Sequence, residues 1–150
     1  MEQRPIRFGI IGCGIIADIH AQCIESTDEA ELAAVFDTKP ESAAAFVEKY
    51  GGDVCGSLEE LLARPDVEAV CICTPSGLHA DQTVLAAKAG KHVLVEKPMA
   101  IRLEDAERMI EACNEAGVRL ATVFPRRMSP QANYARQLIQ EGRLGKLSLC

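Results

Sequence analysis

The sequence predicts an α/β fold: a doubly wound parallel sheet of six strands with helices on both faces. Short apolar runs alternate with segments of helical periodicity along the whole chain, as expected when helices connect parallel strands. The pattern Gly12-x-Gly14-x-x-Ala17 directly follows the first apolar run, where such folds turn from strand into helix. The run Val67 to Cys73 is almost continuously apolar, which is typical of a central strand buried on both faces.

The individual elements follow from the same patterns. We expect strands at residues 6–11, 31–36, 53–55, 67–73, 92–95 and 118–124. We expect helices at about residues 15–25, 40–50, 58–62, a segment ending at 89, 103–116 and 130–141. Residues 1–124 then form one complete domain. Residues 125–150 form a connecting helix and the start of a truncated C-terminal domain, because Gly142 to Cys150 indicates a turn that opens another strand.

Local signals support several helices. Thr38-x-x-Glu41 and Ser57-x-x-Glu60 have the pattern of a capping box, and Pro40 stands near the first helical position of its helix. The apolar stripe of helix 103–116 is expected to face the core through Leu103, Ala106, Met109, Ile110 and Cys113. Helix 130–141 is expected to use Tyr134, Leu138 and Ile139 in the same way.

The glycine pattern also predicts a ligand. Gly12 allows a tight turn, Gly14 lets a pyrophosphate approach the backbone, and Ala17 keeps the helix close to the strand. The helix directs its free N–H groups and positive dipole end at the phosphates, with Cys13, Ile15 and Ile16 in the binding loop. Asp37, at the end of the second strand, is placed to bind a ribose 2′-hydroxyl. The alternative is a strand-to-helix turn with no ligand.

Composition excludes several classes of partner. Hydrophobic residues make up 48% and charged residues 25% of the 150 residues, as in an ordinary globular protein. The net charge is −6 and there is no basic block, so we expect neither nucleic acid nor a membrane surface as partner. No apolar run approaches the length of a membrane span, and the start lacks the apolar core of a signal peptide, so we expect a cytoplasmic protein.

Seven cysteines do not form a recognisable metal or redox pattern. Their number is odd, and Cys71-x-Cys73 has neither zinc-finger nor thioredoxin spacing, so we expect small buried hydrophobes and no metal site. Cys13 is the exception. It lies in the predicted loop beside a helix N-terminus, where a thiolate is favoured.

Three motifs together resemble one family. They are the glycine pattern, Thr74-Pro75-x-x-x-His79 and, above all, Glu96-Lys97-Pro98 directly after a strand. The chain resembles the N-terminal, Rossmann-type domain of the glucose–fructose oxidoreductase, inositol dehydrogenase and rhizopine-catabolism (Gfo/Idh/MocA) family along essentially its whole length. The resemblance implies a second α+β domain that is absent from this chain, and substrates that are mostly sugars, polyols and inositols. It also implies a homo-oligomer for the full-length protein.

The resemblance implies roles for particular residues. Lys97 corresponds to the catalytic lysine, which hydrogen-bonds the substrate oxygen and assists proton movement; a solvated surface lysine is the alternative. Glu96 is expected near the nicotinamide ribose. The other implied cofactor contacts are Thr38 beside Asp37, then Thr74, Pro75, Ser76, His79 and Arg127.

Some of these roles stay open at the level of sequence. His79 can equally hold a structural hydrogen bond at a helix start, and His20 on the first helix is expected to be structural. Arg126 and Arg127 follow the sixth strand, where relatives often carry Gln or Asn before Arg. Either arginine could contact the cofactor or an acidic substrate, and a surface role fits them as well.

The leading hypothesis is therefore the cofactor-binding half of an NAD-dependent oxidoreductase that moves a hydride between nicotinamide and a carbinol carbon. Asp37 favours NAD because its carboxylate repels a 2′-phosphate, while Lys39 leaves NADP possible. The 150-residue chain alone is expected to be inactive, because the remaining acid–base residues of the family come from the second domain. A stand-alone nucleotide-binding sensor or subunit without catalysis is the alternative.

Overall fold

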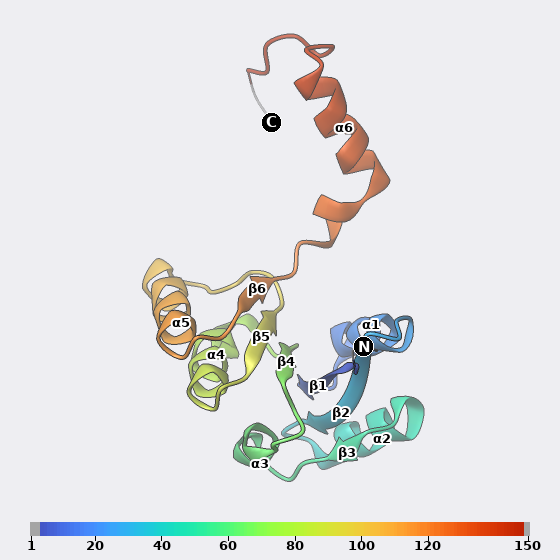
Figure 1. Ribbon diagram of the computed structural model, residues 1–150, viewed down its shortest axis with the longest axis vertical. Helices are drawn as coiled ribbons and strands as arrows, with labels where there is room; N and C mark the ends of the chain where they lie inside the picture. The colour runs from blue at the N-terminus through green and yellow to red at the C-terminus, as the bar shows by residue number, and fades with distance from the viewer. Residues whose placement is uncertain (1–3, 149–150) are drawn as a thin grey trace.

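Six parallel strands form one sheet in the order β3-β2-β1-β4-β5-β6 in the computed structural model, which describes residues 4–148 (Figure 1). The strands are β1 (Ile6–Ile11), β2 (Ala30–Phe36), β3 (Asp53–Val54), β4 (Ala69–Ile72), β5 (His92–Val95) and β6 (Leu120–Thr122). The chain winds outward from β1 to β3, returns to β4 beside β1, and winds to the other edge. The predicted doubly wound fold is confirmed, and its direction reverses between β1 and β4.

Helices cover both faces of this sheet. The helices of the described part are α1 (Ile15–Glu25), α2 (Pro40–Tyr50), α3 (Leu58–Ala63), α4 (His79–Lys88), α5 (Leu103–Glu115) and α6 (Pro130–Gln140), with short 3₁₀ turns η1 (Ser76–Leu78) and η2 (Pro125–Met128), and all but α6 lie on the sheet. The helices α1 and α2 pack on one face, and α3, α4 and α5 pack on the other (Figure 1). None of the described helices is both long and apolar enough to cross a membrane.

The core is divided by the sheet into two clusters. Consecutive strand residues point to opposite faces, so Ile10 packs with α1 and α2 while Ile11 packs on the side of α3, α4 and α5. Cys71 and Cys73 are buried on the α1 side, as expected for small hydrophobes, and Cys55 and Cys113 are buried on the other. The expectation was wrong for Cys23, which is exposed on α1, and Cys150 lies outside the described residues.

One of the two predicted capping boxes forms. Ser57 Oγ accepts a hydrogen bond from the backbone N–H of Glu60 at 3.0 Å, and the Glu60 carboxylate reaches back to the N–H of Gly56 at 2.7 Å. The box predicted at Thr38 was wrong. Helix α2 begins at Pro40, as expected, but its cap residue is Lys39, and no side chain caps its first N–H groups.

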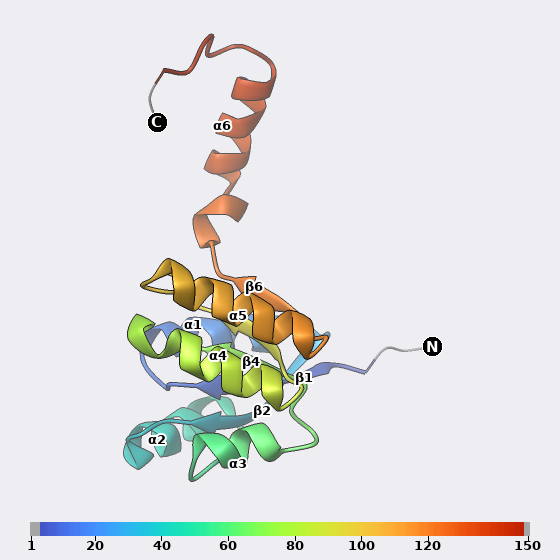
Figure 2. The ribbon, with the colours of Figure 1, turned by 90° about the vertical axis from the view of Figure 1, so that its left-hand side faces the viewer.

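The predicted apolar stripes on α5 and α6 were partly wrong. On α5 only Met109 and Cys113 are buried, because the sheet ends at β6 and leaves the rest of the stripe uncovered. Helix α6 projects away from the sheet and buries none of its residues (Figure 2). The turn after α6 is present, but residues 142–148 contain no strand, and residues 149–150 of the predicted strand lie outside the described part.

The difference in burial between two residues of α5 predicts how much each contributes to the free energy of unfolding. Met109 is 0% exposed, whereas Leu103 on the same helix is 72% exposed. We expect Met109→Ala to lower the free energy of unfolding by about 2–5 kcal/mol, because it opens a cavity against the sheet. The matched variant Leu103→Ala should cost less than about 0.5 kcal/mol. Urea denaturation measures both, and equal losses would contradict the placement of α5.

Candidate functional site at the carboxyl edge of the sheet

The turn after β1 requires glycine at its first position. Gly12 has φ +89°, and its N–H donates to the carbonyl of Phe36 at 2.8 Å. A Cβ added to Gly12 would lie 2.9 Å from Cγ2 of Thr74 and 3.1 Å from the carbonyl carbon of Cys73. Any side chain here would therefore strain the backbone and clash with the chain that follows β4. Gly12 has the tight-turn conformation that the sequence predicted.

Gly14 lies at the N-terminus of α1 for a different reason. A Cβ added to Gly14 would meet nothing within 4 Å, so the space in front of it is open. No side chain caps α1, and the N–H groups of Ile15 and Ile16 have no acceptor within the helix. Ala17 is fully buried and holds this end of the helix against the sheet. An uncapped helix N-terminus facing open space can receive an anionic group such as a phosphate.

Asp37 is held in place by two backbone groups. Its Oδ2 accepts a hydrogen bond from the N–H of Cys13, and its Oδ1 accepts one from the N–H of Lys39, each at 2.8 Å. Each carboxylate oxygen can accept a further hydrogen bond. The carboxylate of Asp37 is thus oriented by the protein and still able to bind two neighbouring hydroxyl groups.

Six of the predicted cofactor residues line one pocket at the carboxyl ends of β1, β2 and β4: Gly12, Gly14, Asp37, Thr38, Thr74 and Pro75. The sequence did not indicate Leu78 or Gln82, which line the same pocket. The hydroxyl of Thr74 donates to Oε1 of Gln82 at 2.5 Å. Only the fold of η1 brings these two side chains together, so spacing alone carried no signal for Gln82.

Glu96, directly after β5, contacts both His20 on helix α1 and the backbone N–H of Lys97. The Glu96 side chain is only 8% exposed, its Oε1 lies 3.0 Å from Nε2 of His20 on α1, and its Oε2 accepts from the N–H of Lys97 at 3.0 Å. The side chain of Lys97 itself is exposed, and the Lys97–Pro98 peptide is cis. His20, expected to be structural, thus supports the Glu96-Lys97-Pro98 motif, a contact that sequence spacing did not reveal.

His79 links the loop that follows β4 to the loop that follows β5. Its ring is 1% exposed, with Nδ1 2.9 Å from the carbonyl oxygen of Pro98 and Nε2 2.9 Å from that of Thr74. Both ring nitrogens therefore lie at hydrogen-bond distance from backbone carbonyl oxygens. This geometry favours the structural alternative for His79, while Ser76 begins the 3₁₀ turn η1 in the connection between β4 and α4.

Lys97 and Arg127 lie in a second pocket. Its walls are Lys97 and the four residues that follow β6 and Val123, namely Phe124, Pro125, Arg126 and Arg127. Arg127 is therefore placed beside Lys97 and apart from the glycine turn. The first pocket lies at the ends of β1, β2 and β4 and the second at the ends of β5 and β6, so the two are neighbours along the same edge of the sheet.

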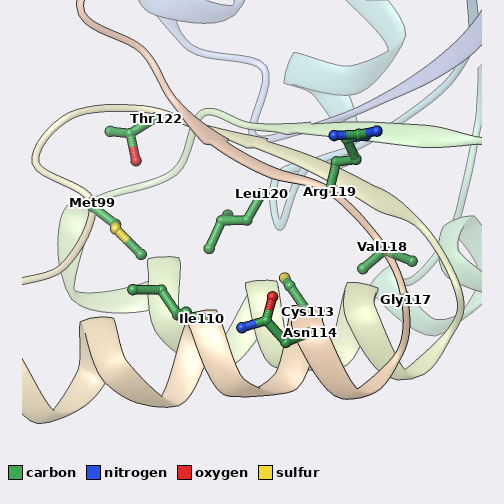
Figure 3. A pocket seen from close by; sticks show the side chains of 9 residues that line it. All are labelled: Met99, Ile110, Cys113, Asn114, Gly117, Val118, Arg119, Leu120 and Thr122. Carbon is green, nitrogen blue, oxygen red and sulfur yellow. The ribbon is translucent and has the colours of Figure 1, made fainter.

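A third hollow between α5 and β6 contains none of the predicted site residues (Figure 3). Met99, Ile110 and Leu120 point toward one another across it. It is the uncovered part of the α5 stripe, at the edge of the sheet and without titratable pairs. Within residues 4–148 no group of three or more His, Cys, Asp or Glu side chains is arranged to hold a metal ion.

The expectation that the helix N-terminus favours a thiolate at Cys13 was wrong. Burial, together with the negative charge of Asp37, raises the pKa of the Cys13 thiol to about 12. The Sγ atom lies 3.9 Å from the carbonyl oxygen of Phe36, where it meets a partial negative charge. The sequence placed Cys13 near the helix N-terminus correctly, but it could not show that the side chain turns away toward β2.

We therefore expect Cys13 to resist alkylation at neutral pH. A pKa of about 12 leaves a thiolate population roughly a thousandfold below that of an unperturbed cysteine. Iodoacetamide labelling at pH 7.5, followed by peptide mass spectrometry, should modify the exposed Cys23 first, and the Cys13 rate should rise about tenfold per pH unit. Labelling of Cys13 as fast as Cys23 at pH 7.5 would contradict this environment.

Comparison with known proteins places this geometry in a family. The oxidoreductase family with an NAD-binding Rossmann fold (Gfo/Idh/MocA) matches residues 6–124. The 1,5-anhydro-D-fructose reductase of Ensifer adhaerens is 40% identical over 141 residues, which are 93% of this chain and 42% of that protein.

Solved structures agree with this match. The WlbA dehydrogenase from Bordetella pertussis in complex with NADH and UDP-GlcNAcA is 43% identical, with a TM-score of 0.91 over 95% of this chain and 44% of that one. The scyllo-inositol dehydrogenase from Lactobacillus casei with bound NAD(H) and scyllo-inositol is 30% identical, with a TM-score of 0.86 over 95% of this chain and 43% of that one. The chain thus spans less than half the length of these relatives. It belongs to the Gfo/Idh/MocA family of oxidoreductases, over their NAD-binding Rossmann domain.

Proposed function

We propose that residues 1–150 form the N-terminal part of a longer NAD-dependent oxidoreductase. This enzyme would move a hydride between nicotinamide and the carbinol carbon of a sugar, polyol, inositol or related substrate. One observation carries the proposal: the open glycine turn and the exposed Lys97 lie along the same carboxyl edge of one parallel sheet. Ligands of open α/β sheets bind at this edge, beside the point where the strand order reverses.

The residues at this edge fit a dinucleotide. The open space at Gly14 and the unpartnered N–H groups of α1 suit the pyrophosphate, and Asp37 suits the adenosine ribose hydroxyls. Thr74 and Pro75 then face the middle of the cofactor. NAD is favoured over NADP because the Asp37 carboxylate would lie against a 2′-phosphate, although the adjacent Lys39 leaves NADP possible.

Lys97 would act on the substrate. When bound, the nicotinamide ring supplies the carbon that accepts or returns the hydride. The ammonium group of Lys97 would donate a hydrogen bond to the carbinol oxygen while the hydride leaves for the nicotinamide and the hydroxyl proton passes to an acid–base residue of the second domain. Glu96 and His20 hold the backbone of Lys97 in place, so that its flexible side chain starts from a fixed point.

The second domain is part of the same proposal. The family match ends at Phe124, and α6 extends from the sheet without burying a residue, which supports a domain core at 1–124 and a connection at 125–150. The remaining acid–base residues, commonly an Asp and a His in this family, would come from the second domain. We also expect a cytoplasmic homo-oligomer; the free state of all six described cysteines supports a reducing compartment.

Removing the Lys97 amine tests this function. In the full-length enzyme, Lys97→Ala should lower kcat by about 10²–10⁴-fold, because hydrogen bonding and proton movement at the substrate oxygen are lost. The affinity for NADH, measured by nicotinamide fluorescence, should stay within about threefold, since Lys97 lies outside the pyrophosphate and adenosine sites.

Lys88→Ala is the matched control, because Lys88 is an exposed lysine in the last turn of α4. It should leave both kcat and NADH affinity unchanged. Unchanged turnover in Lys97→Ala would refute the assignment. Cofactor binding by the full-length protein without turnover of any sugar, polyol or inositol would favour the sensor or subunit hypothesis.

A further inference from the structure

The pocket that contains Lys97 carries three positive charges. It measures about 400 Å³ and is lined by Lys97 from the end of β5 and by Phe124, Pro125, Arg126 and Arg127 from the segment after β6. Phe124 and Pro125 give it apolar walls, while the three cations are the only charged side chains among the described residues that line it. A hollow of this size and character suits a small ligand with an apolar ring face and a negative charge.

Seven arginine and lysine residues of the described part pair with acidic side chains, and these three cations do not. Arg4 pairs with Glu68 at 2.6 Å, Arg64 with Asp66 at 2.8 Å and Arg108 with Asp81 at 2.8 Å. Within residues 4–148 the side chains of Lys97, Arg126 and Arg127 form no ion pair and no side-chain hydrogen bond that meets ordinary geometric criteria. Three like charges therefore share one pocket, and no acidic side chain within residues 4–148 pairs with them to offset their repulsion.

The backbone of the arginine pair is fixed. The N–H of Arg127 donates to the carbonyl of Phe124 at 3.0 Å, which closes the 3₁₀ turn η2. The carbonyl of Arg126 accepts from both the N–H of Ser129 at 3.2 Å and its hydroxyl at 3.0 Å, and Ser129 also caps α6 through the N–H of Ala132. The pocket therefore presents both guanidinium groups from an ordered turn, which lowers the entropy lost on binding.

The position of the pocket separates it from the phosphates of the cofactor. The glycine turn follows β1, and β4 and β5 lie between β1 and β6. With neighbouring strands about 4.8 Å apart, the end of β6 lies about 14 Å from the pyrophosphate position along the edge. Asp37, at the end of β2, lies one strand farther away. An anion at Arg126 and Arg127 would thus be neither the pyrophosphate nor a 2′-phosphate, and would lie beyond Lys97 on the substrate side.

We propose that Arg126 and Arg127 select the substrate by its charge. The molecule whose carbinol reacts at Lys97 would also carry an anionic group, either a carboxylate or a phosphate. This inference rests on the proposed function and narrows its substrate class. Guanidinium groups form two-pronged hydrogen bonds with both kinds of anion. Local positive charge is needed for this, because the chain as a whole has a net charge of −6 and would repel an anion.

Two matched probe series test the proposal on the full-length enzyme loaded with NAD⁺. D-glucose, D-glucuronate and D-glucose 6-phosphate share one ring and differ in the group at C6. Myo-inositol and its 1-phosphate form the second series. Calorimetry gives each Kd, and initial rates give each kcat/KM. We expect at least one anionic probe to bind ten times more tightly than its neutral counterpart, and the carboxylate and phosphate arms show which anion is preferred.

Variants then assign the preference to the arginines. Arg126→Gln and Arg127→Gln should each raise the Kd of the preferred anionic probe by about 10–100-fold, the range for one lost charge-assisted hydrogen bond. The Kd of glucose or inositol should change less than about threefold. Arg126→Lys keeps the charge and should retain part of the preference. Arg4→Gln, which removes an arginine at the opposite end of the strands, should leave every probe unchanged.

The outcomes distinguish a failure of the proposed substrate class from a failure of the proposed oxidoreductase function. No anionic preference in either probe series, or a preference that survives both glutamine variants, overturns the substrate class. If Lys97→Ala still abolishes turnover in that case, the oxidoreductase function stands. Anionic preference together with full turnover in Lys97→Ala would instead overturn the role of Lys97.

Discussion

The turn at Gly12 and Cys13 joins the carboxyl ends of three strands. Gly12 N–H bonds the last residue of β2, Cys13 N–H bonds Asp37, and the carbonyl of Ile11 accepts from Cys73 N–H, all at 2.8 Å. Only a glycine can adopt the positive φ of this turn so close to the chain after β4. The direction of α1, the orientation of the Asp37 carboxylate and the shape of the first pocket all depend on it.

Polar groups at this edge divide into two kinds. The buried ones support backbone: Glu96 holds the N–H of Lys97, and His79 holds the carbonyls of Thr74 and Pro98. The exposed ones, such as the α1 N–H groups and the amine of Lys97, have no partner that would prevent them from meeting a ligand. A site built in this way places its reactive groups precisely without using them for stability.

The sequence predicted the elements of the fold because each depends on local pattern. The glycine motif, the apolar run of β1 and the continuous run of β4 reflect turn geometry and burial within a few residues. The sequence could not predict contacts between distant residues. His20 meets Glu96 across 76 positions, and buried Lys91 donates to the carbonyls of Arg64 and Val67 at 2.7 and 2.9 Å.

The incorrect predictions also concerned contacts between residues that are distant in the sequence. Helical periodicity predicted α5 and α6 correctly but not what covers them, because burial depends on where the sheet ends. The chemistry of Cys13 depended on the direction of one side chain relative to Asp37.

A titration of residues 1–150 with NADH and, separately, NADPH tests the proposed cofactor site most directly. The chain has no tryptophan, so the nicotinamide's own fluorescence reports binding without interference. The account predicts saturable binding that is tighter for NADH. Absence of binding, or tighter binding of NADPH, would contradict the roles of the glycine turn and Asp37.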